Sequence, residues 1–291
     1  RDVAPSRGLG DVYKRQYLFG TYHGTYDILY QYTDSIPELH QAFNACSQFA
    51  GESETTSKPT PAQVGAAIKL PKDTTYADLL NKEDFHFLDS IVRQSLKSPL
   101  NKVYIKPNFL ALILGEIEKG KKLVDTGYSQ SRIDSMKSQV MDIALEKKAK
   151  EKGLTIVGLE GIFDAFVSEK SNLKKEADEL ISDLREDDEI SPLSFVNTLS
   201  DVYRTQNMKS LINFEVKVDS IFRTSPKLTE IGKRIREDLL KRRNLNWMNK
   251  IPELMKAQPT FIAVGVRHLP GKDGLIALLL EKGYQVEPIG L

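Results

Sequence analysis

The fold is decided by residues 260–268, which read Thr-Phe-Ile-Ala-Val-Gly-Val-Arg-His. The first five are β-branched or apolar and run into Gly265, a pattern typical of a short strand buried on both faces. His268 lies three residues after that glycine. Because residues just beyond the carboxyl ends of strands line the usual ligand crevice of an α/β sheet, His268 is a candidate site residue.

The same arrangement occurs near the other end of the chain. Residues 17–19 (Tyr-Leu-Phe) run into Gly20, and His23 lies three residues later. In both places a loop, a helix and a second strand follow. Two strand–Gly-x-x-His–helix–strand units predict an α/β fold class with a single mixed central sheet. We expect His23 and His268 to converge on one site, with their rings within about 12 Å.

The middle of the chain adds two strands and many helices. Residues 48–51 and 155–159 have the pattern of short buried strands. Residues 162–250 are almost wholly helical by periodicity and rich in charge, which predicts a large helical insertion that covers the sheet. We therefore expect one domain over residues 17–291.

Residues 1–16 resemble translated sequencing adaptor. Residues 11–16 (Asp-Val-Tyr-Lys-Arg-Gln) correspond to a transposase-end sequence, and the five residues before them correspond to the adjoining adaptor. We exclude this stretch from the fold prediction and expect the native amino terminus, with any signal sequence, to be missing.

Composition excludes several classes of function. The chain has 41 basic and 40 acidic residues, so no charge excess predicts binding to nucleic acid or to an anionic membrane. Its longest apolar stretch, residues 109–114, is too short for a transmembrane segment. Cys46 is the only cysteine, which excludes an internal disulfide and a thiolate metal site. We interpret Cys46 as a buried inert thiol, and a nucleophilic role is the alternative.

Three carboxylates follow predicted strands, namely Glu52, Glu54 and Glu160. A carboxylate near an imidazole can ligate a divalent ion, orient the ring or act as a general base. The other two histidines, His40 and His86, lie on amphipathic helices and are interpreted as packing or surface residues.

Arg243 and Asn244 supply N–H hydrogen-bond donors, whereas the carboxylates and histidines supply lone pairs. Arginine has no lone pair for a cation, but its planar N–H groups suit a carboxylate or a developing oxyanion. We expect Arg243 and Asn244 to act on substrate or transition state. The alternative is that Arg243 caps its helix or pairs structurally with Glu160.

Together these motifs resemble those of the TraB/GumN family. The resemblance runs from residue 17 to about residue 289, with the motifs in the family's order, and jointly they are specific. The matching stretches are residues 17–23 (Tyr-Leu-Phe-Gly-Thr-Tyr-His), 52–54 (Glu-Ser-Glu), 156–160 (Ile-Val-Gly-Leu-Glu), 243–247 (Arg-Asn-Leu-Asn-Trp) and 264–275 (Val-Gly-Val-Arg-His-Leu-Pro-Gly-Lys-Asp-Gly-Leu).

The resemblance implies a fold related to the Tiki metalloproteases and the erythromycin esterase-like proteins. Tiki proteins are divalent-metal peptidases that trim a secreted signalling protein, and TraB-type proteins reduce the activity of a peptide pheromone. Many bacterial GumN-like members are exported. We accordingly expect an exported bacterial protein, periplasmic or extracellular, whose partner is a peptide or polypeptide substrate.

The leading hypothesis is that the chain is a metal-dependent hydrolase, specifically a peptidase. His23, His268 and Glu160 would ligate manganese, cobalt or zinc, while Glu52, Glu160, Arg243 and Asn244 would be catalytic. The chain has no His-Glu-x-x-His and no Gly-x-Ser-x-Gly, so it is neither an ordinary zincin nor an ordinary α/β-hydrolase. Two alternatives are a metal-independent hydrolase in which histidine and glutamate activate water, and a protein that sequesters a peptide without cleaving it.

Overall fold

The computed structural model describes the chain over residues 2–4, 16–22, 36–54, 59–137, 140–164, 172–185 and 192–289. The chain divides into two compact units, which are described separately. Unit 1 consists of Arg1–Ser57, Met136–Ala165 and Pro192–Leu291, and unit 2 of Lys58–Ser135 and Phe166–Ser191. In these residues no helix is long and apolar enough to cross a membrane.

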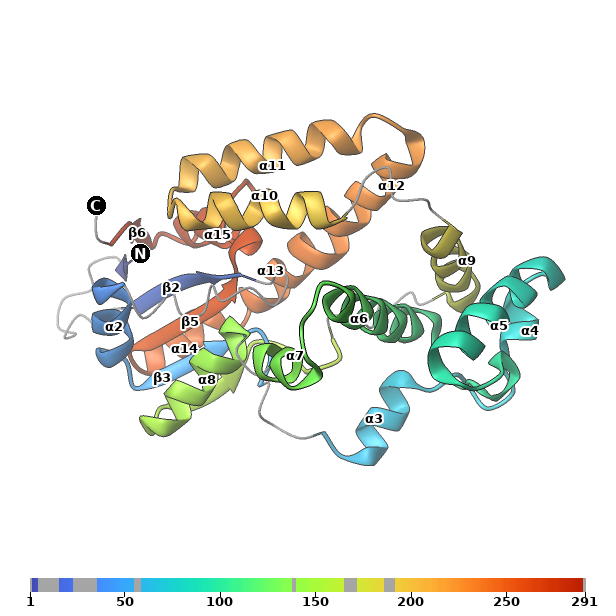
Figure 1. Cartoon of the computed structure of the whole chain (residues 1–291). Helices are drawn as coiled ribbons and strands as arrows, with labels where there is room; N and C mark the ends of the chain where they lie inside the picture. Colours follow the sequence, from blue (N-terminus) through green and yellow to red (C-terminus); the bar gives the residue numbers. More distant parts are fainter. Residues whose placement is uncertain are drawn as a thin grey trace. The chain divides into compact units, whose positions relative to one another are not determined.

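Unit 1 is built on one sheet (Figure 1). Its described part has six strands in the order β4-β3-β5-β2-β1-β6. Neighbours among β2, β3, β4 and β5 are parallel, whereas β1 is antiparallel to both β2 and β6. The predicted α/β class and single mixed sheet are thus confirmed. The strands are β1 (Asp2–Ala4), β2 (Gln16–Thr21), β3 (Gln48–Gly51), β4 (Thr155–Gly158), β5 (Thr260–Gly265) and β6 (Gln285–Glu287).

The two Gly-x-x-His strands lie side by side. In the β2–β5 pair Leu18 is opposite Ile262 and Gly20 is opposite Val264. All six residues of β5 are buried, because β5 is paired on both edges and covered on both faces. The carboxyl ends of these parallel strands therefore lie at one edge of the sheet.

Alternate residues of β5 enter two different cores, as the strand period of two requires. Ile262 and Val264 pack with α13 (Arg242–Trp247), α14 (Ile251–Ala257) and α15 (Leu275–Glu281). Phe261 and Ala263 pack on the opposite face with α2 (Pro37–Asn44) and α8 (Met141–Glu151). The sheet thus has helices on both faces, the arrangement that a parallel sheet needs.

The sheet includes residues of the adaptor-like stretch 1–16. Asp2–Ala4 form β1, and β2 begins at Gln16, one residue before the predicted strand. The buried Gln16 amide donates to the Met255 carbonyl at 2.8 Å and accepts from the Thr260 amide at 2.9 Å. Gln16 therefore joins the start of β2 to the start of β5.

The described part of residues 162–250 is mainly helical, as expected. In unit 1 it comprises α10 (Pro192–Arg204), α11 (Met208–Phe222), α12 (Pro226–Arg234), the π-helix η2 (Ile235–Lys241) and α13. π-helical turns are rare and frequently lie at functional sites. Here the π-helix runs directly into α13, which carries Arg243 and Asn244.

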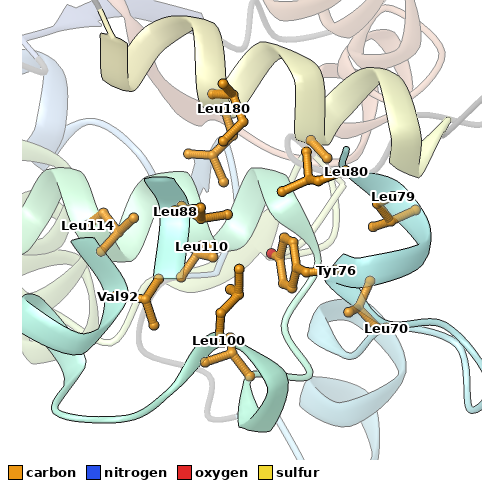
Figure 2. Close-up of a cluster of buried hydrophobic side chains, with 13 residues drawn as sticks. Leu70, Tyr76, Leu79, Leu80, Leu88, Val92, Leu100, Leu110, Leu114 and Leu180 are labelled. Carbon is orange, nitrogen blue, oxygen red and sulfur yellow. The ribbon is translucent and has the colours of Figure 1, made fainter. Parts of the chain in front are cut away.

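Unit 2 is helical and has its own core (Figure 2). Its longest helices are α5 (Lys82–Leu96), α6 (Pro107–Asp125) and α9 (Leu173–Arg185). Leu88 of α5, Leu110 of α6 and Leu180 of α9 meet there with Tyr76. The other helices are α3 (Pro61–Ile68), α4 (Tyr76–Leu79), the 3-10 helix η1 (Leu100–Lys102) and α7 (Gln130–Lys137), whose last residues lie beyond unit 2.

The core of unit 2 can be tested with two leucines of one helix. Leu110 is fully buried, whereas Leu112 is 44% exposed. Leu110→Ala should lower the free energy of unfolding by about 2–5 kcal/mol, because it leaves a cavity, and Leu112→Ala should lower it by less than about 0.5 kcal/mol. Urea denaturation measures both changes, and equal losses would contradict this description of the core.

Candidate functional site

Three neighbouring strands deliver three of the predicted site residues to one edge of the sheet. Glu52 follows β3, Glu160 follows β4, and His268 ends the 3-10 turn η3 (Val266–His268) after β5. The Glu160 amide donates to the Glu52 carbonyl at 2.8 Å, so the pairing of β3 with β4 continues past the strand ends. This pairing fixes the two carboxylates next to each other.

A glycine permits this close approach of the two strand ends. A Cβ atom on Gly158 would lie 2.9 Å from the Glu54 amide nitrogen and 3.0 Å from the Glu160 carbonyl oxygen. Both contacts are with backbone atoms, which cannot move aside without disturbing the loop. The Gly158-Leu159-Glu160 segment therefore needs glycine at its first position to bring Glu160 to Glu52.

Arg243 of α13 lies between the two carboxylates. Its Nη2 donates to Glu52 Oε2 and to Glu160 Oε1, both at 2.5 Å, and its Nε donates to Glu160 Oε1 at 2.9 Å. The sequence allows Arg243 to face a substrate, to cap its helix or to pair with Glu160. In the structure its side chain pairs with Glu160 and with Glu52 as well.

The cluster is almost withdrawn from water. The side chains of Arg243, Glu52 and Glu160 are 10%, 14% and 10% exposed. Burial lowers the pKa of Arg243, but the hydrogen bonds that Arg243 donates to Glu160 and Glu52, together with the charges of both carboxylates, more than offset this, so the pKa is raised above its ordinary value. Arg243 is therefore a permanent cation between two carboxylates.

Asn244 fixes the ring of His268. The Asn244 Nδ2 donates to the carbonyls of His268 at 3.2 Å and Asp273 at 2.8 Å, so the Asn244 Oδ1 is the acceptor that faces the imidazole. His268 Nδ1 lies 2.7 Å from that oxygen and must therefore carry a proton. In the neutral ring, the lone pair is then on Nε2, which lies 3.3 Å from Arg243 Nη1.

We expected Asn244 to act on substrate, but its two amide donors are engaged by backbone carbonyls. This arrangement makes Asn244 a positioning residue for His268 and for the loop that follows it. Both Asn244 and His268 are buried, so the orientation of the ring is held inside the protein.

Trp247 completes the cluster, and sequence reasoning assigned it no role. Its Nε1 donates to Glu160 Oε2 at 3.0 Å, and its ring lies 4.7 Å from the Arg243 guanidinium and 4.5 Å from the His268 ring. Arg243 and Trp247 are four residues apart, so both lie on one face of α13. That spacing, and its status as the only tryptophan of the chain, were the available signals.

The remaining candidates do not join the described cluster. Glu54 is 42% exposed and lies 3.6 Å from Lys150, while His40 and His86 are exposed on their helices. Cys46 is buried with a free thiol. His23 lies outside the described residues, so its predicted approach to His268 stays a prediction.

A divalent metal ion does not fit the described part of this site. No group of three or more His, Cys, Asp or Glu residues there could hold one. Both oxygens of Glu52 and of Glu160 already accept N–H groups, from Arg243, Trp247 and the Gly265 amide. Because His23 lies outside the described residues, the predicted ligation of manganese, cobalt or zinc by His23, His268 and Glu160 stays a prediction.

Fold and site together define an α/β protein with a carboxylate–arginine–histidine cluster at the carboxyl edge of a parallel sheet. The chain belongs to the TraB/PrgY/gumN family, whose model matches residues 11–288. The match includes residues 11–16, which belong to the adaptor-like stretch. No curated protein and no solved structure matched the chain.

The burial of the ion pairs predicts a large effect of removing Arg243. Arg243→Met leaves two buried carboxylates without their cation and should lower the free energy of unfolding by about 3–5 kcal/mol. Arg267 is the control, because it makes a similar two-bond pair with Glu215 but is 27% exposed. Arg267→Met should cost no more than about 1 kcal/mol in urea denaturation. A comparable loss in both variants would contradict the site description.

The interpretation of Cys46 as inert predicts its reactivity. Burial raises the pKa of the Cys46 thiol to about 12, so about one molecule in ten thousand carries a thiolate at pH 8. A thiol-reactive disulfide reagent should label Cys46 rapidly in urea and only slowly in the native protein. Rapid native labelling at pH 8 would restore the nucleophile alternative.

Because only the unfolded state can ionise this thiol readily, the free energy of unfolding should fall as the pH rises from about 9 towards 12.

Proposed function

We propose that this chain is a hydrolase that cleaves peptides or polypeptides, with His268 as general base and Arg243 as oxyanion donor. The observation that carries the proposal is the 3.3 Å separation of His268 Nε2 from Arg243 Nη1. A base and a cationic donor at this spacing can hold a water molecule and a carbonyl oxygen at adjacent positions.

Only some of the N–H groups of Arg243 donate to the two carboxylates. Nε and Nη2 are directed to the carboxylates, whereas Nη1 contacts only His268 Nε2 among the described residues. A guanidinium has five N–H bonds, two of them on Nη1. One Nη1 hydrogen therefore remains for a substrate carbonyl, and the carboxylates fix its direction.

The reaction follows from these groups. A water hydrogen first replaces the Arg243 Nη1 hydrogen at the lone pair of His268 Nε2. The water then loses that proton to Nε2 as its oxygen bonds to the carbonyl carbon, and the carbonyl oxygen becomes an oxyanion on Arg243 Nη1. The intermediate then releases the amine, which takes the proton back from His268. Before the reaction Glu52, Glu160 and Arg243 sum to one negative charge, and Glu52 Oε1 lies 3.8 Å from His268 Nε2. That charge stabilises the imidazolium while it exists.

The choice of substrate rests on the family resemblance. Peptides are the substrates or targets of the Tiki and TraB-type proteins that the motifs resemble, and an amide carbonyl suits the donor described above. Export from a bacterial cell is proposed on the same basis.

The metal-dependent form of the reaction is the competing proposal. It requires Glu160 to exchange its bonds with Arg243 and Trp247 for a cation held also by His23 and His268. The two forms differ in a direct way, because the metal-dependent form loses activity on chelation and regains it with manganese, cobalt or zinc.

Hydrolysis of a defined peptide mixture, followed by mass spectrometry with and without a chelator, tests the proposal. We expect new termini in both samples, none with His268→Gln, and unchanged cleavage with His86→Gln, which alters an exposed histidine of unit 2. Arg243→Lys keeps the charge but loses the planar donors. Its lower kcat/KM should correspond to a loss of about 1–3 kcal/mol of transition-state stabilisation.

Cleavage that requires added metal would establish the competing form. No cleavage of any peptide, or equal cleavage by His268→Gln, would overturn the proposed hydrolase. Circular dichroism of each variant ensures that a loss of activity is not a loss of folding.

A further inference from the structure

Unit 1 contains a cavity of about 460 Å³ that the catalytic proposal does not use. Its walls are mainly apolar and include Leu39 of α2, Val202 of α10 and Leu211 of α11. Val266 and Leu269 also line it, and these residues flank His268 in the sequence. The cavity thus adjoins the loop that holds the proposed base, and its volume is within the range of small-ligand sites.

The cavity runs along the edge of β2. Four consecutive residues, Tyr17, Leu18, Phe19 and Gly20, all line it. Successive side chains of a strand point to opposite faces of the sheet, so a cavity over one face would meet only alternate residues. Contact with four in succession places part of the cavity beside the strand, and contact with Phe261 of β5 shows that it also extends over the face that carries Tyr17.

Among the described residues, no strand pairs with Phe19 and Gly20 on this edge. β5 pairs with the other edge of β2, and β1 reaches only Gln16 and Tyr17. From the cavity side, the Tyr203 hydroxyl donates to the Gly20 carbonyl at 2.7 Å. That carbonyl therefore faces the cavity, and because strand amides alternate between edges, the amide of Leu18 faces it too.

The turn between α10 and α11 forms the outer wall. Gln206 adopts a left-handed backbone with φ of 51°, and the next residue, Asn207, caps α11 by accepting from the amides of Lys209 and Ser210. A non-glycine residue in this conformation is strained, and such strain is concentrated at ligand clamps and active sites. Gln206, Asn207 and Lys209 all line the cavity.

We infer that an extended peptide with apolar side chains binds along β2 as an added strand, with one side chain in this cavity. A strand edge recognises peptide backbone through main-chain hydrogen bonds, and an adjoining pocket selects the side chain. The Gly20 carbonyl can accept a peptide N–H beside the Tyr203 hydroxyl, since it has two lone pairs. The inference rests on the proposed function and specifies its substrate class as peptides with a bulky apolar residue close to the cleaved bond.

Binding is measured separately from cleavage by using the full-length His268→Gln protein. The probes are three blocked, fluorescein-labelled pentapeptides: Lys-Val-Leu-Val-Lys, its counterpart with N-methylated valines, and Lys-Ser-Asn-Ser-Lys. Fluorescence anisotropy should show binding of the first peptide, and binding at least about tenfold weaker for the other two, which lack the backbone donors or the apolar side chains.

Two threonines provide a matched pair of variants. Thr205 lines the cavity and Thr224 does not, yet both are exposed and both donate to the carbonyl three residues earlier at 2.7 Å. Thr205→Trp should weaken binding of the apolar peptide at least about tenfold by filling the mouth of the cavity, whereas Thr224→Trp should leave it unchanged.

Equal binding of the three peptides, no binding, or equal effects of the two tryptophan variants would overturn this inference. Selective binding without hydrolysis by the wild-type chain would leave it standing and would remove the proposed hydrolase instead. Hydrolysis at equal rates with and without apolar side chains, and with and without N-methylation, would overturn this inference and leave the proposed hydrolase standing.

Discussion

The guanidinium of Arg243 holds the site of this protein together. It joins carboxylates that follow two different strands, 83 and 191 positions away in the sequence, and contacts the imidazole that follows a third strand. Taking these charges out of water is costly, and the cost is offset only while all of them remain in contact. The ends of β3, β4 and β5 are therefore tied to the position of one helix.

That helix also determines the state of the histidine. Within one turn, α13 presents Arg243, Asn244 and Trp247 to the strand ends, and each contacts a different side of the site. Asn244 fixes which ring nitrogen of His268 carries the proton, and Trp247 packs against the ring and holds Glu160. The lone pair of Nε2 is directed at the cation as a consequence of packing, before any substrate is present.

Much of the fold was predictable because it follows from local patterns. The apolar runs at residues 48–51 and 260–264 became strands, and the strand-end rule located Glu52, Glu160 and His268 at one edge of the sheet. Pairing of Arg243 with Glu160 was one of the alternatives that the sequence offered, but the choice among them and the second partner, Glu52, could not be predicted, because local sequence does not determine which distant partner a buried cation contacts. The roles of Trp247 and Gln16 depend in the same way on long-range hydrogen bonds, which no periodicity reports.

The central claim is that His268 is a neutral base with its proton on Nδ1, held beside a permanent cation. Nitrogen-15 NMR of the histidine side chains measures this directly, with His268→Gln providing the assignment. At pH 7.5 we predict a protonated Nδ1 and an unprotonated Nε2 for His268. A ring protonated on Nε2, either as the other tautomer or as an imidazolium, would contradict the account, because no lone pair would then face the Arg243 donor.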